Sequence, residues 1–316
     1  MLQFSRINSE PFIEPKDFTV APDAVTTPDV LKFKDELILF VGAVSGKQER
    51  IISQNFPIDS LVHKKSGAIS KNARVVLEPG PNSFDNKHVF DPATIIVKDK
   101  IFLFYSAIGS GEDSIGLAIS ADGKKFIKQP EPILTGRSPE IIKDNENLIL
   151  YYVKKSIKGS YQVFAAFLSS NAELKNLIHT PTLIEGQSGT WDHIEVTTPR
   201  VFKRNGIFYM VYAGCDQPSR KDVPNGFGLA RSEDLLNWYK YPNNPVFKIG
   251  NPSSWDDGAI WFGTVFEWND DLYLVYEGGQ LEDITSFSPA ITRVGLAKIS
   301  GDEFDRLISE WSWDDE

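Results

Sequence analysis

The sequence contains a single cysteine, Cys215, among its 316 residues. An internal disulfide and a thiolate metal cluster both need at least two cysteines, so neither can form within this chain. Cys215 follows Tyr212-Ala213-Gly214 at the expected end of a strand. At such a position, a small core residue is a better interpretation than a nucleophile.

The chain also lacks a basic run and a long apolar run. Its 33 Lys and Arg residues are outnumbered by 43 Asp and Glu residues, which gives a formal net charge of -10. This charge disfavours nucleic acid as a partner. No stretch approaches ~18 uncharged apolar residues, and the start, MLQFSRINSE, has no apolar signal-peptide core. We therefore expect a soluble, cytoplasmic protein without a membrane partner.

Helical periodicity is nearly absent, and only SEDLLNW at 232–238 could form a turn or two of helix. What the chain has instead is a repeat of β-rich hairpins. Each copy is a β-rich run, a polar turn such as Lys-Asp or Asn-Gly, and a second β-rich aromatic run. The copies lie at 26–43, 90–107, 137–153, 197–214 and 262–279.

The spacing of the hairpins indicates the architecture. Anchored on Pro28, Pro92, Pro139, Pro199 and Gly263, the intervals are 64, 47, 60 and 64 residues. Such an interval holds about four short strands, as in one propeller blade. Strand-like segments at 115–126, 163–171, 227–238 and 294–300 would supply the outer strands. We predict an all-β fold: one five-bladed β-propeller domain over 1–316, with antiparallel four-stranded blades around a central funnel.

Three repeats also share an aromatic-Asp pair eight residues before the anchor, in SFDNKHVFDP, TWDHIEVTTP and SWDDGAIWFG. We interpret these pairs as loop plugs, in which the aromatic ring fills space between blades and the Asp caps backbone amides. The residues concerned are Phe84, Asp85, Trp191, Asp192, Trp255 and Asp256.

Candidate site residues follow from the inner strands, which line the channel of a propeller. Because side chains alternate along a strand, the residues just before and just after each anchor should share a face. That face would carry the acids Asp29, Asp91 and Glu140 from three blades. Carboxylates that face one another repel, which separates an acid from a base. Two such groups are the minimum needed to hydrolyse a glycosidic bond.

The hairpins, especially FDPATIIVKDKIFLFYSA, TPRVFKRNGIFYMVYAG and FGLARSEDLLNW, resemble the five-bladed glycosidases of the arabinanase, invertase and levansucrase superfamily, with glycoside hydrolase family 43 nearest. The resemblance covers about residues 20 to 300. It implies that Asp29 is the general base, Asp91 orients the site and tunes the acid, and Glu140 is the general acid. The family usually places its first-blade Asp before the proline, whereas Asp29 follows Pro28; strand alternation would keep it facing inward.

The signatures of the invertase branch are missing, so single displacement with inversion is favoured over a covalent intermediate. Imidazole, guanidinium and carboxylate groups near the rim would bind sugar hydroxyls, and an aromatic ring could stack on a sugar face. The predicted substrate-binding residues are His88, Arg137, His193, Glu195, Arg200 and Trp261.

Two alternatives remain open. The β-mannoside phosphorylases of family 130 share the architecture and use inorganic phosphate, which Arg137, His193 and Arg200 could hold. A propeller that binds glycans without cleaving them is the other. We expect a carbohydrate ligand and no cofactor; no ligand spacing supports a metal site or a central calcium, and the sequence does not indicate an oligomeric state.

Overall fold

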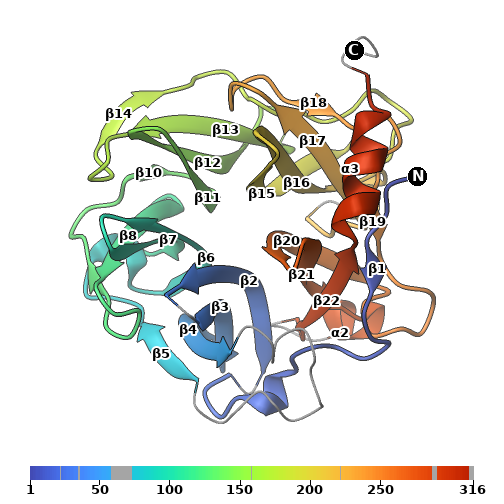
Figure 1. The fold of residues 1–316 in the computed structure, drawn as a ribbon. Coiled ribbons are helices and arrows are strands. Elements are labelled where there is room, and N and C mark those ends of the chain that lie inside the picture. The colour runs from blue at the N-terminus through green and yellow to red at the C-terminus, as the bar shows by residue number, and fades with distance from the viewer. Residues whose placement is uncertain are drawn as a thin grey trace.

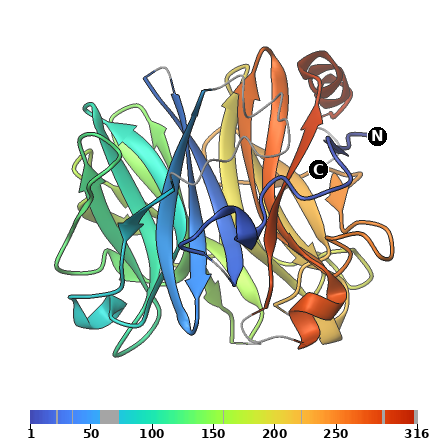
Figure 2. The same cartoon turned by 90° about the horizontal axis from the view of Figure 1, so that it is seen from below.

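Five antiparallel sheets stand in a ring in the computed structural model (Figure 1). The structure describes residues 1–21, 23–34, 36–57, 73–157, 159–220, 222–286 and 290–312. Seen edge-on, the strands run steeply along the ring axis (Figure 2). The predicted all-β, five-bladed propeller is confirmed.

The blades follow one another along the chain, and each begins with its innermost strand. Blade 1 contains β2 (Ala24–Phe33), β3 (Glu36–Ser45), β4 (Gln48–Pro57) and β5 (Arg74–Leu77). Blade 2 contains β6 (His88–Val97), β7 (Lys100–Ile108), β8 (Ser114–Ser120), β9 (Ile127–Lys128) and β10 (Leu134–Thr135). Blade 3 contains β11 (Arg137–Asp144), β12 (Asn147–Lys155), β13 (Tyr161–Leu168) and β14 (Leu174–Leu177).

The last two blades complete the ring. Blade 4 contains β15 (Glu195–Arg204), β16 (Ile207–Cys215), β17 (Gly226–Ser232), β18 (Tyr239–Lys240) and β19 (Phe247–Lys248). Blade 5 contains β20 (Ala259–Trp268), β21 (Asp271–Gly279), β22 (Arg293–Ile299) and, as its outermost strand, β1 (Ser5–Arg6). Because β1 pairs with β22, the start of the chain closes the ring against its last blade.

The five predicted hairpins are the five innermost strand pairs, and their turns explain why the sequence revealed them. Asn145, Asn205, Asn269 and Asp270 have positive φ in these turns. Asn and Asp tolerate this left-handed conformation better than most residues, which is why polar turn pairs mark tight hairpins.

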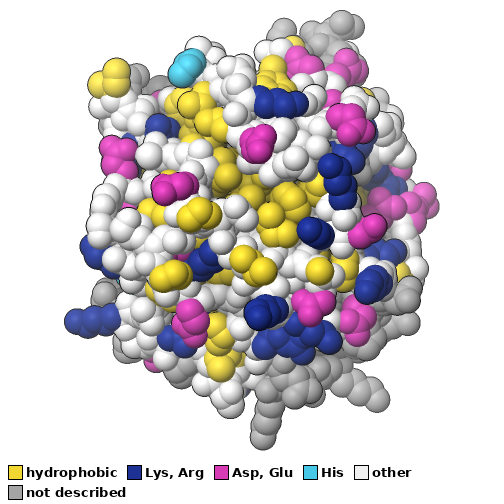
Figure 3. All heavy atoms as spheres, turned by 90° about the vertical axis from the view of Figure 1, so that its left-hand side faces the viewer, with side chains coloured by type: hydrophobic (Ala, Val, Ile, Leu, Met, Phe, Trp, Pro, Cys, Tyr) yellow, Lys and Arg dark blue, Asp and Glu magenta, His cyan; other side chains and the backbone are white. Residues whose placement is uncertain are grey.

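The core is divided into five clusters of buried apolar side chains, each shared by two neighbouring blades. In one of them, Phe40 of blade 1 packs with Leu103 and Tyr105 of blade 2. On the outer wall shown in Figure 3, acidic and basic side chains are interspersed with apolar ones. The blades are therefore held together mainly by apolar burial across their interfaces.

The prediction of helix at 232–238 is wrong, because residues 233–237 form bends. The described α-helices are α2 (Leu281–Ser286) and α3 (Gly301–Ser309), and three single-turn 3-10 helices lie at Pro15–Asp17, Ser83–Asp85 and Pro218–Arg220. Ser300 caps α3 by accepting a hydrogen bond from the Glu303 amide, and Phe304 packs edge-on against Tyr209 of blade 4. None of the helices in the described ranges is long and apolar enough to cross a bilayer.

The aromatic-Asp pairs lie at blade junctions, but among the described residues their carboxylates bind side chains and not the backbone amides that were expected. Asp85, Asp192 and Asp256 are almost completely buried. Each accepts a hydrogen bond from a tyrosine of its own blade, at 2.8 to 3.0 Å, and each pairs with one cation at 2.6 Å. The tyrosines are Tyr105, Tyr212 and Tyr276, and the cations are Lys128, Lys240 and Arg6.

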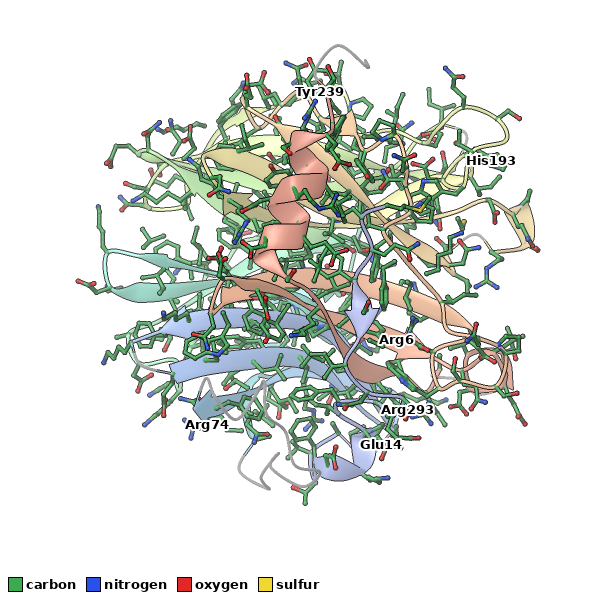
Figure 4. All side chains as sticks on the ribbon, turned by 45° about the vertical axis from the view of Figure 1, so that its right-hand side comes forward. Arg6, Glu14, Arg74, His193, Tyr239 and Arg293 are labelled. Carbon is green, nitrogen blue, oxygen red and sulfur yellow. The ribbon has the colours of Figure 1, made fainter. Side chains whose placement is uncertain are left out.

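Arg6 shows how the chain start completes this pattern. Lys128 lies on β9 and Lys240 on β18, short strands within their own blades. In blade 5 the same role is taken by Arg6 of β1, which lies beside the outer edge of that blade (Figure 4). Its guanidinium also stacks over Phe247, 4.4 Å from the ring centroid. The ring closure is therefore supported by an ion pair and by a cation–aromatic contact, in addition to the backbone pairing of β1 with β22.

We predict that Arg6→Met lowers the free energy of unfolding by about 2 to 3 kcal/mol, because it leaves the buried Asp256 carboxylate without its cation. Urea denaturation measures this loss. The matched control is Arg306→Met, which removes an exposed ion pair to Glu310 on α3 and should cost less than about 0.5 kcal/mol. Equal losses in the two variants would contradict the assignment.

Candidate active site

All five innermost strands carry a β-bulge at the same place. The pairing register shifts by one residue at each anchor, for example between Thr26 and Asp29. The residue before each anchor has φ between 47° and 51°. These residues are Thr27, Asp91, Ser138, Thr198 and Phe262. Since left-handed backbone is rare for such residues, its fivefold recurrence makes the bulge a property of the architecture.

The bulge corrects the expectation that the residues on either side of an anchor share a face. The extra residue breaks the strict alternation of side chains. The five residues before the anchors line a central cavity, whereas the residues after them do not. Asp91 therefore faces the cavity, and Asp29 and Glu140 do not.

The cavity has a volume of about 420 Å³, within the range of small-molecule sites. All five blades contribute to its wall. It contains four carboxylates, two cations and four aromatic rings. These are Glu49, Asp91, Asp222 and Glu277; Arg137 and Lys155; and Phe90, Tyr161, Trp261 and Phe262.

Asp91 is a buried carboxylate held by two hydroxyl groups. Its Oδ2 accepts hydrogen bonds from Ser106 Oγ at 2.7 Å and from Ser138 Oγ at 3.3 Å. Burial raises the pKa of the Asp91 carboxyl, while Arg137 and the two serines oppose this rise. The contacts that oppose the rise all favour the ionised form of Asp91.

Glu49 and Glu277 lie beside Asp91 and face the same cavity. Glu49 Oε1 accepts from Thr26 Oγ1 at 2.6 Å, and Glu277 Oε2 accepts from the Thr27 amide at 2.8 Å. Burial raises the pKa of Glu49 to about 7, with a further contribution from Asp91. Burial likewise raises the pKa of Glu277 to about 8, with contributions from Glu49 and Asp91. The three carboxyls thus form one electrostatically coupled cluster.

Thr198 adds an unused polar group to this cavity. Its side chain is almost fully buried, and its Oγ1 has no hydrogen-bond partner among the described residues. A buried hydroxyl without a partner is costly. Its place on the cavity wall points to a ligand that would complete its bonding.

Asp29 and Glu140 instead bind the neighbouring blades. Asp29 Oδ2 accepts from the Thr94 amide at 2.9 Å, and Glu140 Oε1 accepts from the Val201 amide at 2.9 Å. Glu140 also forms an ion pair with Arg200 at 3.2 Å. The expectation that these acids face one bound sugar together with Asp91 is not met by the geometry. Their catalytic roles stay a prediction.

Arg200, predicted to bind substrate, is 2% exposed and does not line the cavity. Its guanidinium donates to the carbonyls of Pro139 at 2.7 Å and Pro92 at 3.0 Å, and to Thr264 Oγ1 at 3.1 Å. These groups belong to three other blades, so Arg200 crosses the axis of the ring. Arg200 and its acceptors therefore form a hub that ties together the inner strands of these blades.

The remaining predicted substrate-binding residues divide into two groups. Arg137 and Trp261 line the cavity, whereas His88, His193 and Glu195 do not. His193 lies in a loop at the edge of the molecule, with its Nδ1 2.6 Å from the Thr190 carbonyl oxygen (Figure 4). Glu195 is fully buried and accepts from the Asp222 amide at 2.7 Å. It therefore holds the loop that carries Asp222 to the cavity.

Glu49, Asp222 and Glu277 were not predicted, because only the first strand of each hairpin was expected to line the channel. Glu49 lies on the third strand of blade 1 and Glu277 on the second strand of blade 5. One signal was available: Glu277 stands in LVYEGG, a charged residue within an otherwise apolar strand. Among the described residues, no group of three or more His, Cys, Asp or Glu is arranged to hold a metal ion.

No protein-family model and no curated protein matches this sequence. Solved structures do match it over nearly their whole length. One comes from work stating that the GH130 family of mannoside phosphorylases contains glycoside hydrolases that target β-1,2-mannosidic linkages in Candida mannan. It has a TM-score of 0.71 and 15% identity, and the match covers 95% of this chain and 94% of that one.

Two family-43 structures are similar as well. A thermostable family-43 glycoside hydrolase matches with a TM-score of 0.63 and 21% identity, over 89% of this chain and 91% of that one. The GH43_1 enzyme from Xanthomonas citri, complexed with xylotriose, has a TM-score of 0.63 and 14% identity, over 93% and 90%. At these identities the matches establish a shared fold, which agrees with both resemblances inferred from the sequence.

We predict that Glu277→Gln stabilises the protein at alkaline pH. Below about pH 4.5, its ordinary pKa, the glutamate is protonated in both the folded and unfolded states. Between pH 4.5 and about 8 it ionises in the unfolded chain while burial keeps it protonated in the fold, so the stability of the wild type falls. A neutral glutamine avoids this loss and still accepts from the Thr27 amide.

Thermal unfolding at pH 5 and pH 8.5 measures the effect. The melting temperature of Glu277→Gln relative to wild type should rise by about 2 °C or more between these pH values. Glu112→Gln, at an exposed position outside the cavity, is the control and should show no such rise. A constant difference for Glu277→Gln would contradict the assigned protonation.

Proposed function

We propose that this protein is a glycoside hydrolase that cleaves its substrate by single displacement with inversion. The observation that carries the proposal is the coupled cluster of Asp91, Glu49 and Glu277 in the central cavity. Carboxylates with strongly raised pKa values in a cleft are typical of catalytic sites. Glycoside hydrolysis requires such a pair, one carboxyl protonated and the other ionised. The fold that the chain shares with glycoside hydrolases supports the same function.

The environments of the carboxyls support a different role for each. Glu277, with a pKa of about 8, is protonated at neutral pH and donates its proton to the glycosidic oxygen as the bond to the anomeric carbon breaks. Asp91 is stabilised as a carboxylate by Ser106, Ser138 and the nearby Arg137. It accepts the proton of the water that attacks the anomeric carbon from the opposite side. Glu49 adds to the raised pKa of Glu277.

The rest of the cavity suits a sugar. The indole of Trp261 lines the wall, where Nε1 donates to the Asp222 carbonyl at 3.4 Å. A ring fixed in this way can pack against the apolar face of a pyranose or furanose. The hydroxyl of Thr198 can exchange hydrogen bonds with sugar hydroxyls. The cavity therefore combines an aromatic platform with polar groups, as sugar sites require.

The alternatives fit these contacts less well. Of the three cations suggested for phosphate binding, only Arg137 lines the cavity; Arg200 belongs to the hub and His193 to a peripheral loop. Lys155 is a second cation on the wall and is the observation that favours a phosphorylase. A purely binding propeller would gain nothing from burying three carboxyls together, since Asp91 raises the pKa of both glutamates and Glu49 raises that of Glu277, at a cost in stability.

We predict that Asp91→Asn and Glu277→Gln each lower kcat/KM by about a thousandfold or more, because each removes one proton-transfer step. The assay is hydrolysis of a panel of aryl glycosides and oligosaccharides, with Glu112→Gln as the exposed control. Asp29→Asn and Glu140→Gln variants that fold should keep activity, because Asp29 bonds the Thr94 amide and Glu140 bonds Arg200 and the Val201 amide outside the cavity. Loss of turnover in those variants with normal turnover in Asp91→Asn would contradict the assignment.

The pH profile gives a second test of the roles. In the wild type, kcat/KM should rise as Asp91 ionises and fall above about pH 8, where Glu277 loses the proton that it donates. A profile that stays flat up to pH 10 would exclude Glu277 as the acid.

Hydrolysis and phosphorolysis are separated by adding inorganic phosphate to the assay. A hydrolase should release the free sugar at the same rate with and without phosphate. Formation of a sugar 1-phosphate that depends on added phosphate would show that the protein is a glycoside phosphorylase.

A further inference from the structure

The charged groups of the cavity are separated by blade. Its carboxylates come from blades 1, 2 and 5 and from the loop after β16, while both of its cations, Arg137 and Lys155, come from blade 3. Arg137 begins β11 and Lys155 ends β12, so both lie at the same end of this blade. Tyr161, opposite Lys155 in the pairing of β12 with β13, completes the cationic wall. The cavity is therefore polarised from one side to the other.

Lys155 is exposed, and no carboxylate of the described residues lies within ion-pairing distance of its Nζ. Its ammonium group lies over the ring of Tyr161, 4.9 Å from the centroid. This contact fixes the direction of the side chain without neutralising its charge.

Arg137 also keeps free donors. Its Nε lies 3.5 Å from the Asp113 carboxylate and its Nη1 donates to the Tyr161 hydroxyl at 3.5 Å. Its guanidinium makes no other hydrogen bond to the described residues, whereas a guanidinium has five N–H donors. Its fork suits a planar or tetrahedral oxyanion better than a single hydroxyl. Arg137, whose charge also acts on Asp91 and Asp113, offers unused donors to a ligand, and Lys155 adds a second positive charge.

We propose that the glycan bound in this cavity carries an anionic group, a carboxylate or a phosphate or sulfate ester, that lies against Arg137 and Lys155 of blade 3. The inference rests on the proposed function in taking the ligand to be a sugar. A neutral sugar would satisfy the aromatic and hydroxyl groups of the wall but would leave the charge of Lys155 unused. The protonated state of Glu277 at neutral pH limits the repulsion that an anion meets on entering.

The test is calorimetric titration at low ionic strength with matched pairs of ligands. The pairs are glucuronic acid and glucose, galacturonic acid and galactose, and mannose 6-phosphate and mannose, with inorganic phosphate as a separate ligand. At least one anionic sugar should bind about tenfold or more tightly than its neutral partner, the gain expected of one charge-assisted contact. Lys155→Met should remove most of this preference. Raising the salt concentration should weaken it.

Lys154→Met is the matched control, because Lys154 is an exposed lysine of the same strand that does not line the cavity. This variant should keep the preference. If no anionic sugar binds more tightly than its partner, or if Lys155→Met and Lys154→Met behave alike, the inference is wrong. It is also wrong if inorganic phosphate binds as tightly as the sugar phosphate, since the wall would then hold free phosphate.

The outcome is separate from that of the proposed function. Turnover of neutral glycosides without any preference for anionic ones would overturn this inference and leave the hydrolase intact. Tight, Lys155-dependent binding of an anionic sugar by a protein that cleaves no glycoside would support the inference and overturn the hydrolase.

Discussion

One buried guanidinium holds the axis of the propeller. Arg200 donates to the carbonyls of Pro92 and Pro139, to Thr264 and to the carboxylate of Glu140, and so connects four blades. Only the rigid, multiply donating fork of an arginine can satisfy acceptors in so many directions at once. Inner strands fixed in this way cannot slide, and the bulge that presents Asp91 to the cavity depends on their register.

The buried carboxyls that the structure describes at the centre of the propeller include some paired with a cation in the scaffold and some without a bonded cation in the cavity. Below the cavity, Glu140 is balanced by Arg200, so its carboxylate has an ion partner. Inside the cavity, Glu49 and Glu277 lack a directly bonded cation among the described residues, and burial raises their pKa values to about 7 and 8. Such a pattern is expected when stabilising ion pairs lie in the scaffold, while the site itself keeps buried carboxyls that cost stability.

The sequence predicted the propeller because the hairpins are local. Polar turns, aromatic strands and their spacing are all visible within short windows. The short strand β1, which completes the last blade by pairing with β22, was not among the predicted strands. The site was harder to predict. Asp91, Arg137 and Trp261 line the cavity, as the sequence pattern suggested, and their roles stay a prediction. A one-residue bulge with positive φ, however, leaves no clear trace in TTPDVL or RSPEII. Strict alternation of side chains therefore predicted Asp29 and Glu140 beside Asp91. Glu49 and Glu277 reach the cavity from later strands of their blades, which were not expected to line the channel.

The hub of Arg200 has a consequence for how the molecule can vary. One guanidinium bonds acceptors in three other blades, so a substitution at the centre of any one inner strand disturbs contacts made by the others. Sequence change is therefore easier to accommodate in the loops that connect the strands than at the strand centres that meet at this side chain.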